Sequence, residues 1–367
     1  MIYLVDTIGT ETGMHLYNQS FCNTLQAKGV SVRVLSNYTS ADGRQKALFP
    51  NFYHGGKLLM MIKFAWALFI FALFRLSHSG TYVYQSFGLR MIDQFFIRII
   101  GRKNLFVIVH DIFEITGSNG EDARKAQKIA FYQKHIPAII CHSEDALQTF
   151  HDFGYQGRTI YYPHFSYEFS KEINPHEVAP EIKDAVKTDK INFLFFGQLR
   201  QTKGITILQQ AINNLKQQDF AGNIIIAGMD KEHFIDETQQ PPFVQTILRY
   251  ITDSELNHLF SICQYVLLPY TEIYQSGVLE VVIYFRCPAL MSDIPYFNHI
   301  VASFPSFGQT FSPNTPESLA LKMLEISKGE IRAHKYFTPE DLAKYESQHD
   351  PSRLIAFLLE EEKNDKQ

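Results

Sequence analysis

The chain has 367 residues, a length that suits two domains of ordinary size, each with its own core. Hydrophobic residues make up 46% and charged residues 20%, as in soluble globular proteins, and there is no low-complexity tract. The net charge of -4 argues against nucleic acid as a partner, and the four scattered cysteines predict free thiols in a reducing compartment rather than a metal cluster. No basic segment precedes the first apolar run, so we expect no signal peptide and a cytoplasmic location.

The first half of the chain alternates short β-rich runs with segments of helical period. We predict strands at 1–5, 31–36, 81–86, 105–110, 137–141 and 158–162. Helical patterns fall between them, at 14–28, 57–77, 88–101, 121–133 and 143–152. This alternation indicates a parallel sheet that is covered by helices.

The same pattern starts again at Ile191. Strands are predicted at 191–196, 222–227, 244–248, 264–269, 288–291 and 308–311, and helices at 203–218, 253–262, 276–286 and 314–328. Residues 164–190 are polar and contain Pro175 and Pro180, which predicts a linker and a surface helix. We therefore expect two Rossmann-like α/β domains, with ligands at the carboxyl ends of their strands. A single large doubly wound sheet is the competing fold, and the restart at Ile191 counts against it.

The first strand ends in a glycine-containing loop that opens onto a helix. By its position the loop faces a phosphate or a sugar, and its candidate residues are Gly9, Thr12 and Gly13. The spacing GxGxxG is absent, so the loop is not a dinucleotide fingerprint. His110 ends a later strand, where it is either functional or a structural histidine satisfied by its neighbours.

Residues 58–74 are apolar except for Lys63. A spanning helix needs about 20 apolar residues, and a lysine is costly at membrane depth, so we expect a crossover helix rather than a membrane span. Residues 57–103 carry seven basic side chains and one acid, Asp93. This surface predicts peripheral attachment to an anionic membrane, and a buried helix with solvated flanking charges is the alternative.

Two cations follow the strand at 191–196. Gly197 permits a tight turn, after which Arg200 and Lys203 project from the carboxyl end of the strand. Arg200 can bind phosphate oxygens through its planar fork, and Lys203 supplies a compact charge. Together they can neutralise a leaving diphosphate, although ordinary solvated cations in a helix-start loop are the alternative.

Two glutamates bracket a strand–loop–helix junction between Tyr270 and Phe297. Glu272 lies in the loop, Ser276 and Gly277 open the helix, and Glu280 lies one turn inside it. A helix N-terminus presents unpaired N–H groups and a positive dipole end, so it can seat a phosphate. This layout suits a nucleotide sugar, with hydroxyls at both ends and a diphosphate between; two exposed surface glutamates are the alternative.

This spacing resembles the Glu-x7-Glu motif of retaining GT-B glycosyltransferases of family 4. Residues 197–204, 223–228 and the Arg249-Tyr250-Ile251 turn are also similar to segments of that family. The resemblance implies a GT-B fold of two Rossmann-like domains facing across a cleft. The N-terminal acceptor domain covers 1–170, the C-terminal donor domain covers 171–350, and a helix and tail at 351–367 can cross back to the first domain.

The resemblance also implies roles for individual residues. Arg200 and Lys203 would grip the donor pyrophosphate, Glu272 the donor-sugar hydroxyls and Glu280 the ribose diol. Further donor contacts would come from Gly197, Tyr250, Ile251, Ser276, Gly277 and Val278, acceptor contacts from Gly9, Thr12 and Gly13, and His110 would lie beside the donor sugar. Glu272, His110, Lys203 and Arg200 are the expected catalytic residues.

Three positions depart from the family pattern. Gln198 stands where arginine is common, Gln275 where many relatives have an aromatic residue, and Arg286 where glycine usually forms a left-handed helix cap. At the nearby base-binding turn, Asp253 is expected to cap the helix that follows.

The expected activity is retaining, metal-independent transfer of a sugar from a nucleotide diphosphate sugar to a lipid-linked glycan, in surface polysaccharide biosynthesis. No Asp-x-Asp motif occurs, so no metal site and no further cofactor are expected. The expected location is the inner face of the cell membrane. A nucleotide-sugar 2-epimerase on the same fold and a catalytically inactive scaffold subunit are the alternatives.

Overall fold

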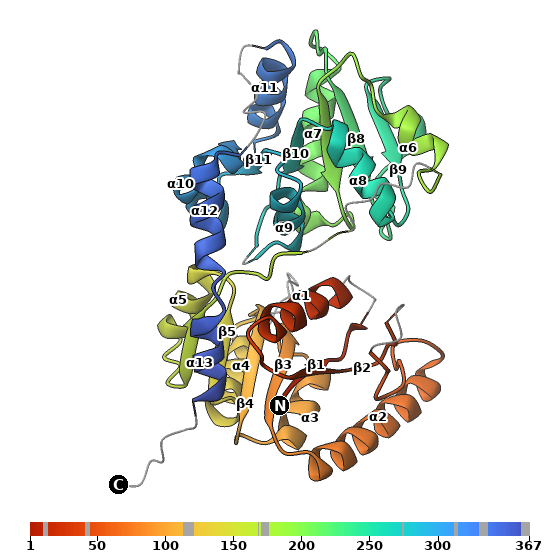
Figure 1. Cartoon of the computed structure of the whole chain (residues 1–367). Coiled ribbons are helices and arrows are strands. Elements are labelled where there is room, and N and C mark those ends of the chain that lie inside the picture. The colour runs from red at the N-terminus through yellow and green to blue at the C-terminus, as the bar shows by residue number, and fades with distance from the viewer. Residues whose placement is uncertain are drawn as a thin grey trace. The chain divides into compact units, whose positions relative to one another are not determined.

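The computed structural model describes residues 1–9, 14–40, 45–112, 121–167, 169, 176–273, 275–311, 315–329 and 337–360. The chain forms two compact units (Figure 1). Unit 1 comprises Met1–Phe165 and Gln348–Gln367, and unit 2 comprises Ser166–Ser347. The units divide a few residues before the expected boundary at 170/171, and the C-terminal segment groups with unit 1.

Unit 1 contains a parallel sheet of six strands in the order β2-β1-β3-β4-β5-β6. The strands are β1 Ile2–Asp6, β2 Val32–Ser36, β3 Thr81–Phe87, β4 Leu105–Asp111, β5 Ala138–Cys141 and β6 Arg158–Tyr161. The central residues of β1, β3, β4 and β5 are apolar and buried, as expected where helices cover both faces of a parallel sheet, whereas the edge strands β2 and β6 are only partly buried. The strand order reverses between β1 and β3, which makes the carboxyl ends of these two strands the switch point of the sheet.

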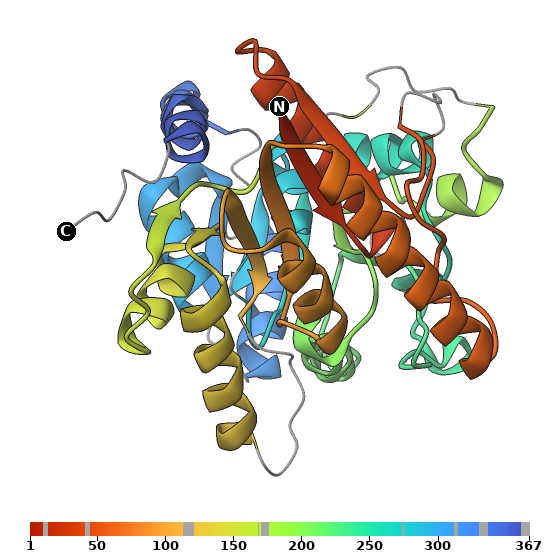
Figure 2. The same ribbon diagram turned by 90° about the horizontal axis from the view of Figure 1, so that it is seen from below.

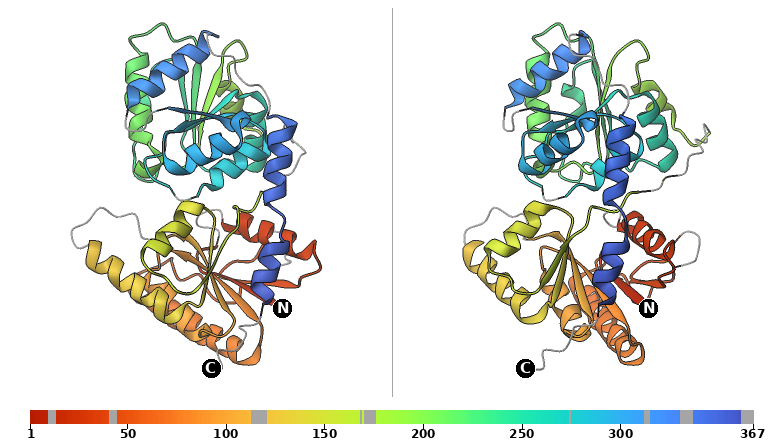
Figure 3. Two further views of the ribbon diagram at one scale, coloured as in Figure 1. Left: turned by 90° about the vertical axis from the view of Figure 1, so that its left-hand side faces the viewer. Right: turned by 60° about the vertical axis from the view of Figure 1, so that its left-hand side comes forward.

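The helices of unit 1 also follow the predicted pattern. They are α1 Met14–Gln26, α2 Lys57–Ser77, α3 Met91–Ile100, α4 Glu121–His135, α5 Glu144–Asp152 and α13 Ser352–Leu359. Helix α2 is the crossover between β2 and β3, as predicted, and Figure 2 shows it as one long helix. Helix α13 lies beside the sheet of unit 1 (Figure 3), where the Phe357 ring lies 5.4 Å from the Phe106 ring.

Unit 2 contains a second parallel sheet of six strands in the order β12-β11-β10-β7-β8-β9. The strands are β7 Asn192–Phe196, β8 Asn223–Ala227, β9 Val244–Ile247, β10 Tyr265–Leu268, β11 Ala289–Ser292 and β12 Gly308–Phe311. This is the strand order of the doubly wound dinucleotide-binding fold, and its switch point lies between β7 and β10. The predicted α/β fold of two Rossmann-like domains is therefore confirmed.

The helices of unit 2 are α6 Pro180–Ala185, α7 Ile205–Leu215, α8 Asp253–Ile262, α9 Gly277–Tyr284, α10 Pro295–Ser303, α11 Pro316–Ser327 and α12 Pro339–Gln348, with 3-10 turns at Gln201–Lys203, Glu237–Gln239 and Pro305–Phe307. Of these, α7 and α11 pack on the sheet around a core of aliphatic and aromatic side chains. Helix α6 is the surface helix expected in the linker. Helices α10 and α12 were not predicted.

Candidate active site

The donor-side residues of unit 2 gather at its switch point. Gly197 follows β7 directly and has a φ of 110°, a conformation that favours glycine. A Cβ atom at this position would lie 3.1 Å from Lys203 Nζ and 3.4 Å from Val278 Cγ2. The Lys203 ammonium and the first turn of α9, which the sequence analysis assigned to one anion site, therefore meet over the same glycine.

The loops that follow β7 and β10 are fastened to each other. Thr271 N donates a hydrogen bond to Thr202 O at 3.0 Å. Gly204 has a φ of 74°, and a Cβ atom there would lie 1.6 Å from Pro269 O. Only glycine allows this approach, so the position of Lys203, one residue earlier, is set by backbone packing rather than by its own side chain.

The two cations differ in their surroundings. Lys203 is partly exposed, and burial, followed by the nearby charge of Arg200, lowers its pKa to about 8. Its Nζ lies 6.0 Å from the centre of the Tyr270 ring, at the limit of a cation–π contact. Arg200 is exposed, and its Nη2 donates to Gln198 Oε1 at 2.8 Å. Gln198 thus accepts a hydrogen bond from the arginine and orients it.

The N-terminus of α9 is capped by the side chain of Ser276, and Gly277 beside it lies close to Tyr167. Ser276 Oγ accepts a hydrogen bond from Leu279 N at 3.1 Å. A Cβ atom on Gly277 would lie 2.8 Å from Tyr167 Oη, so a larger residue at position 277 would require this tyrosine side chain to move. Glu272 is exposed in the loop before the helix.

Glu280 is buried, with 4% of its surface exposed. Tyr345 Oη of α12 donates a hydrogen bond to Glu280 Oε2 at 2.5 Å. Burial raises the pKa of Glu280 to about 8, so the carboxyl group is mostly protonated at neutral pH. The sequence analysis missed Tyr345, because nothing in the sequence connects this residue to the helix tip.

The turn at Arg249-Tyr250-Ile251 is held by ion pairs. Arg249 Nη1 and Nη2 donate to the two oxygens of Glu255 at 2.8 and 2.7 Å, and these bonds lower the pKa of Glu255 to about 2. Tyr250 is exposed and Ile251 is buried.

The prediction that Asp253 caps the following helix is wrong. Thr252 Oγ1 accepts from Glu255 N at 3.4 Å, and Glu255 Oε2 accepts from Thr252 N at 3.0 Å. Thr252 and Glu255 form a reciprocal capping box, which satisfies two N–H groups where Asp253 alone would satisfy one.

In unit 1, the loop after β1 is shaped by a buried aspartate. Asp6 Oδ1 accepts from Ile8 N at 2.9 Å and from Gly9 N at 3.0 Å. Gly9 has a φ of 68°, and a Cβ atom on it would lie 2.1 Å from Asn37 Oδ1. The other two predicted acceptor residues, Thr12 and Gly13, lie outside the described residues.

His110 is buried at the end of β4 and joins a chain of hydrogen bonds. Its Nε2 donates to Gln85 Oε1 at 3.2 Å, Gln85 Nε2 donates to Asn18 Oδ1 at 2.5 Å, and Asn18 Nδ2 donates to Asp6 Oδ2 at 2.7 Å. Burial, with smaller effects from two neighbouring histidines, holds the pKa of His110 well below its usual range, so the ring is neutral. The chain links His110 to the loop that contains Gly9.

The sequence analysis missed Asn18 and Gln85. A glutamine that follows Tyr82, Val83 and Tyr84 inside a predicted buried strand is the signal that could have found the second of them, because a buried amide needs partners.

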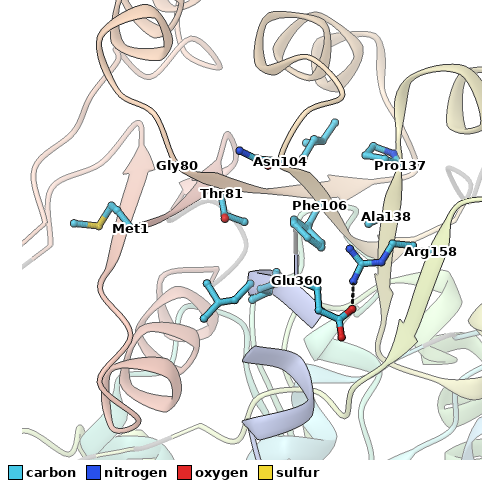
Figure 4. Close-up of a pocket in the computed structure, with 12 residues that line it drawn as sticks. Met1, Gly80, Thr81, Asn104, Phe106, Pro137, Ala138, Arg158 and Glu360 are labelled. Carbon is cyan, nitrogen blue, oxygen red and sulfur yellow. Dashed lines mark hydrogen bonds and ion pairs between the residues drawn. The ribbon is translucent and has the colours of Figure 1, made fainter. Parts of the chain in front are cut away.

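A cavity of about 200 Å³ lies at the opposite edge of the unit 1 sheet (Figure 4). Its lining includes Thr81, Leu105 and Ala138, the first residues of β3, β4 and β5, so it sits at the amino ends of the strands. An ion pair of 2.9 Å between Arg158 and Glu360 closes one side. The cavity is therefore separate from the switch point of this sheet. Among the described residues, no His, Cys, Asp and Glu side chains form a group of three or more that could hold a metal ion.

Comparisons with known proteins support a glycosyltransferase. Residues 180–340 match the family described as glycosyl transferases group 1. No curated protein matches the sequence significantly.

Similar solved structures cover nearly the whole chain. Sucrose-phosphate synthase from Thermosynechococcus elongatus is 12% identical, with a TM-score of 0.67 over 97% of this chain and 96% of that one. A glycosyltransferase from Rickettsia africae is 12% identical, with a TM-score of 0.67 over 98% of each chain. HepE from Anabaena, in complex with UDP and glucose, is 16% identical, with a TM-score of 0.67 over 98% of each chain. These likenesses confirm the GT-B fold.

Proposed function

We propose that this chain is a retaining glycosyltransferase of family 4 that needs no metal ion and no cofactor besides its nucleotide diphosphate sugar. It transfers a hexosyl group from that donor to a lipid-linked glycan, in surface polysaccharide biosynthesis at the inner face of the cell membrane. One observation carries the proposal: Lys203 Nζ and Val278 at the tip of α9 lie 3.1 and 3.4 Å from the Cβ position of Gly197, at the sheet's switch point.

Two similar structures support the choice of substrates. HepE has been solved with UDP-glucose as well as with UDP and glucose, which favours a nucleotide sugar as the donor. WaaG, 14% identical with a TM-score of 0.59, is described as a glycosyltransferase of lipopolysaccharide biosynthesis, which favours a lipid-linked glycan as the acceptor.

The proposed reaction breaks the bond between the anomeric carbon and the diphosphate oxygen. The diphosphate leaves with the bonding electrons. The acceptor hydroxyl forms the new bond on the same face and passes its proton to the departing diphosphate oxygen. Lys203, Arg200 and the backbone N–H groups of 276–278 stabilise the negative charge on the diphosphate. Preformed donors of this kind act without reorganising during the reaction, which is why they contribute strongly to rate.

The remaining donor contacts follow from the same placement of the diphosphate. Glu272, exposed in the loop before α9, binds hydroxyls of the donor sugar, while Glu280 binds the ribose diol through the oxygen that Tyr345 does not occupy. The turn at Tyr250 and Ile251 contacts the base through its backbone.

Within unit 1, we assign the acceptor contacts to the loop after β1. The loop at Gly9, Thr12 and Gly13 binds the acceptor. His110 is kept neutral by burial and is oriented by its hydrogen bond to Gln85, and its proposed position is beside the donor sugar.

Turnover with a panel of donors tests the proposal. The full chain is screened with UDP-, GDP- and ADP-sugars by thermal shift, since a ligand that binds only the native state raises the melting temperature. Release of nucleotide diphosphate is then measured for the best donor, in the presence of a chelator. Lys203→Met and Glu272→Ala are each expected to lower the rate about 100-fold, the usual cost of losing a donor or contact at the transition state.

Matched controls and distinct outcomes separate the alternatives. Lys328→Met and Glu232→Ala remove exposed charges of the same kinds elsewhere in unit 2 and should leave the rate unchanged. Conversion of the donor sugar without any acceptor would indicate the epimerase. Donor binding together with identical nucleotide diphosphate release for wild type and Glu272→Ala would indicate the inactive scaffold. Strict dependence of the rate on divalent ions would refute metal independence.

A further inference from the structure

Helix α2 exposes an unusual run of large apolar side chains, which we call the α2 outer face. Its members recur every three or four residues and are each between 51% and 85% exposed: Leu58, Ile62, Trp66, Phe69, Leu73 and Leu76. This spacing places them on one side of a helix. Soluble proteins rarely leave so continuous an apolar stripe in water, so the face is expected to have a partner.

The opposite side of α2 belongs to the core of unit 1. Ala67, Phe71 and Phe74 are buried there. The Phe71 ring lies 5.0 Å from the Phe96 ring of α3, and the Phe74 ring lies 5.4 Å from the Tyr3 ring of β1. These contacts fix α2 against the sheet and leave its outer face turned to solvent.

Helix α2 has the composition of a transmembrane helix, but its contacts within unit 1 oppose insertion across a membrane. Among the described residues, it is the one helix long and apolar enough to cross a membrane, with a mean hydropathy of 2.0 and 17% of the apolar window buried. Spanning would require α2 to abandon its contacts with Phe96 and Tyr3. A position in the plane of the interface keeps those contacts and still buries the outer face.

The exposed charges of residues 57–103, the stretch that contains α2, are all positive. Asp93, the one acid between 57 and 103, is buried and paired with Arg90 at 2.9 Å, so these two charges cancel. The remaining cations of this stretch are Lys57, Lys63, Arg75, Arg98, Arg102 and Lys103, and each is partly or fully exposed. They stand out in a chain whose net charge is -4, and they are complementary to an anionic surface.

We propose that α2 lies in the plane of an anionic membrane, with its outer face at the boundary between headgroups and acyl chains. Trp66 and Phe69, whose rings stack at 5.4 Å, would sit at the headgroup level that aromatic side chains prefer. A second copy of the chain fits less well, because a two-fold contact through α2 would bring like charges together. The membrane contact is inferred from α2 itself. Only its role, which is to bring the chain to a lipid-linked acceptor, rests on the proposed function.

Vesicle flotation of the full chain tests this inference. Wild type is expected to float with vesicles of phosphatidylglycerol and phosphatidylcholine, and to stay unbound with phosphatidylcholine alone. The triple variant Trp66→Ser, Phe69→Ser, Leu73→Ser should lower the bound fraction at least tenfold. The variant Arg98→Gln, Arg102→Gln, Lys103→Gln should weaken binding about fivefold per cation removed. Leu321→Ser, which removes an exposed leucine from α11 in unit 2, is the matched control and should bind as wild type does.

Several results would overturn the inference. The first is a wild-type chain that does not bind anionic vesicles, and the second is a triple variant that binds as wild type does. The third is a chain that resists extraction from membranes at alkaline pH, which would show that it spans the membrane. Self-association without lipid that the triple variant abolishes would identify a second copy as the partner. Turnover with the donor is measured on the same samples, so a failed membrane inference and a failed transferase are told apart.

Discussion

Lys203 combines a fixed position with an adjustable charge. The backbone contact between Gly204 and Pro269 sets where the residue lies, and partial burial beside Arg200 lowers its pKa to about 8. A bound diphosphate favours the charged form and raises this pKa again. The lysine is thus most firmly protonated when an anion is present, which suits a group that must stabilise a leaving diphosphate.

Nucleotide binding is therefore expected to weaken above pH 8. Without ligand, Lys203 loses its proton as the pH rises through about 8, so the affinity for the nucleotide diphosphate should fall up to about tenfold per pH unit above that value. Lys203→Arg stays charged throughout this range and should give a flat profile. Titration calorimetry of both proteins between pH 7 and 10 checks this; parallel profiles would show that another group controls the dependence.

Glu280 should make unit 2 less stable as the pH rises. Its pKa is about 8 in the folded chain and near 4.5 as a free carboxyl, so the folded state holds the extra proton between these values. Stability is full below about pH 4.5 and is lost as the pH rises toward 8. Glu280→Gln stays neutral and can still accept from Tyr345, so it should stabilise the unit by up to about 3 kcal/mol at pH 7.

Denaturant melts at several pH values measure this difference. The gain from Glu280→Gln should shrink toward zero near pH 4.5. Glu325→Gln, which neutralises a surface glutamate paired with Lys322, is the control and should show no such trend. A gain that does not vary with pH would mean that Glu280 keeps its charge when buried.

The sequence locates some of these residues and not others. Gly197 directly follows β7, and Lys203 and Ser276 lie in the segments that connect β7 and β10 to the helices after them. The carboxyl ends of adjacent parallel strands share one edge, so the proximity of these residues could be predicted. Tyr345 reaches Glu280 from a helix far along the chain. That contact depends on the path of the chain through the whole unit, which no local pattern encodes.

At the scale of elements, the C-terminus of α9 has an arginine in a conformation that suits glycine. Arg286 has a φ of 54°, and its N–H donates to Ile283 O at 3.0 Å. The sequence analysis noted glycine as the usual residue here, and the left-handed cap is retained despite the substitution. A left-handed L-residue costs about 1–2 kcal/mol, so the helix end carries some strain.

Replacing this arginine should relieve the strain only when the replacement is glycine. Arg286→Gly should be about 1 kcal/mol more stable than Arg286→Ala, because alanine keeps the Cβ atom. Both variants lose the same charge at the helix end, so the comparison isolates the backbone term. Urea unfolding of the two variants measures the difference, and equal midpoints would contradict the argument.

The strands were predictable because buried parallel strands are short, apolar and bounded by turn residues. Helices with an apolar period were predictable for a similar reason. Helix α12 was missed because its described residues bury only Tyr345, which leaves no periodic apolar face to detect. Helix α10 buries only Tyr296 and Phe297, adjacent residues that do not define a helical period.

At the scale of the molecule, the cluster of buried histidines in unit 1 and the buried Glu280 of unit 2 titrate in opposite directions. In unit 1, Tyr17 is surrounded by the rings of His110, His142 and His164, all of which are buried. Burial lowers the pKa of all three, to about 4 for His142 and about 3 for His164. Unit 2 instead buries Glu280 with a raised pKa. The histidine cluster should therefore weaken unit 1 as the pH falls, and Glu280 should weaken unit 2 as the pH rises.

Acid is expected to weaken unit 1 through these histidines. An unfolded histidine takes up its proton near pH 6.5, whereas His142 resists protonation until about pH 4, so stability is full above 6.5 and is lost as the pH falls between these values. Asp6 and Asp93 of the same unit have raised pKa values and act in the opposite direction, so a variant is needed to isolate the histidine effect.

His142→Asn removes one of the three titrating rings, while its amide can still donate and accept. It should reduce the loss of stability of unit 1 between pH 6.5 and 4 by up to about 3 kcal/mol. Hydrogen exchange followed by mass spectrometry resolves the two units and measures this difference in unit 1 peptides. The variant should not change exchange in peptides of unit 2. After correction for the intrinsic effect of pH on exchange, those peptides should exchange faster as the pH rises toward 8. An unchanged acid response in His142→Asn would show that the buried histidines do not control the stability of unit 1.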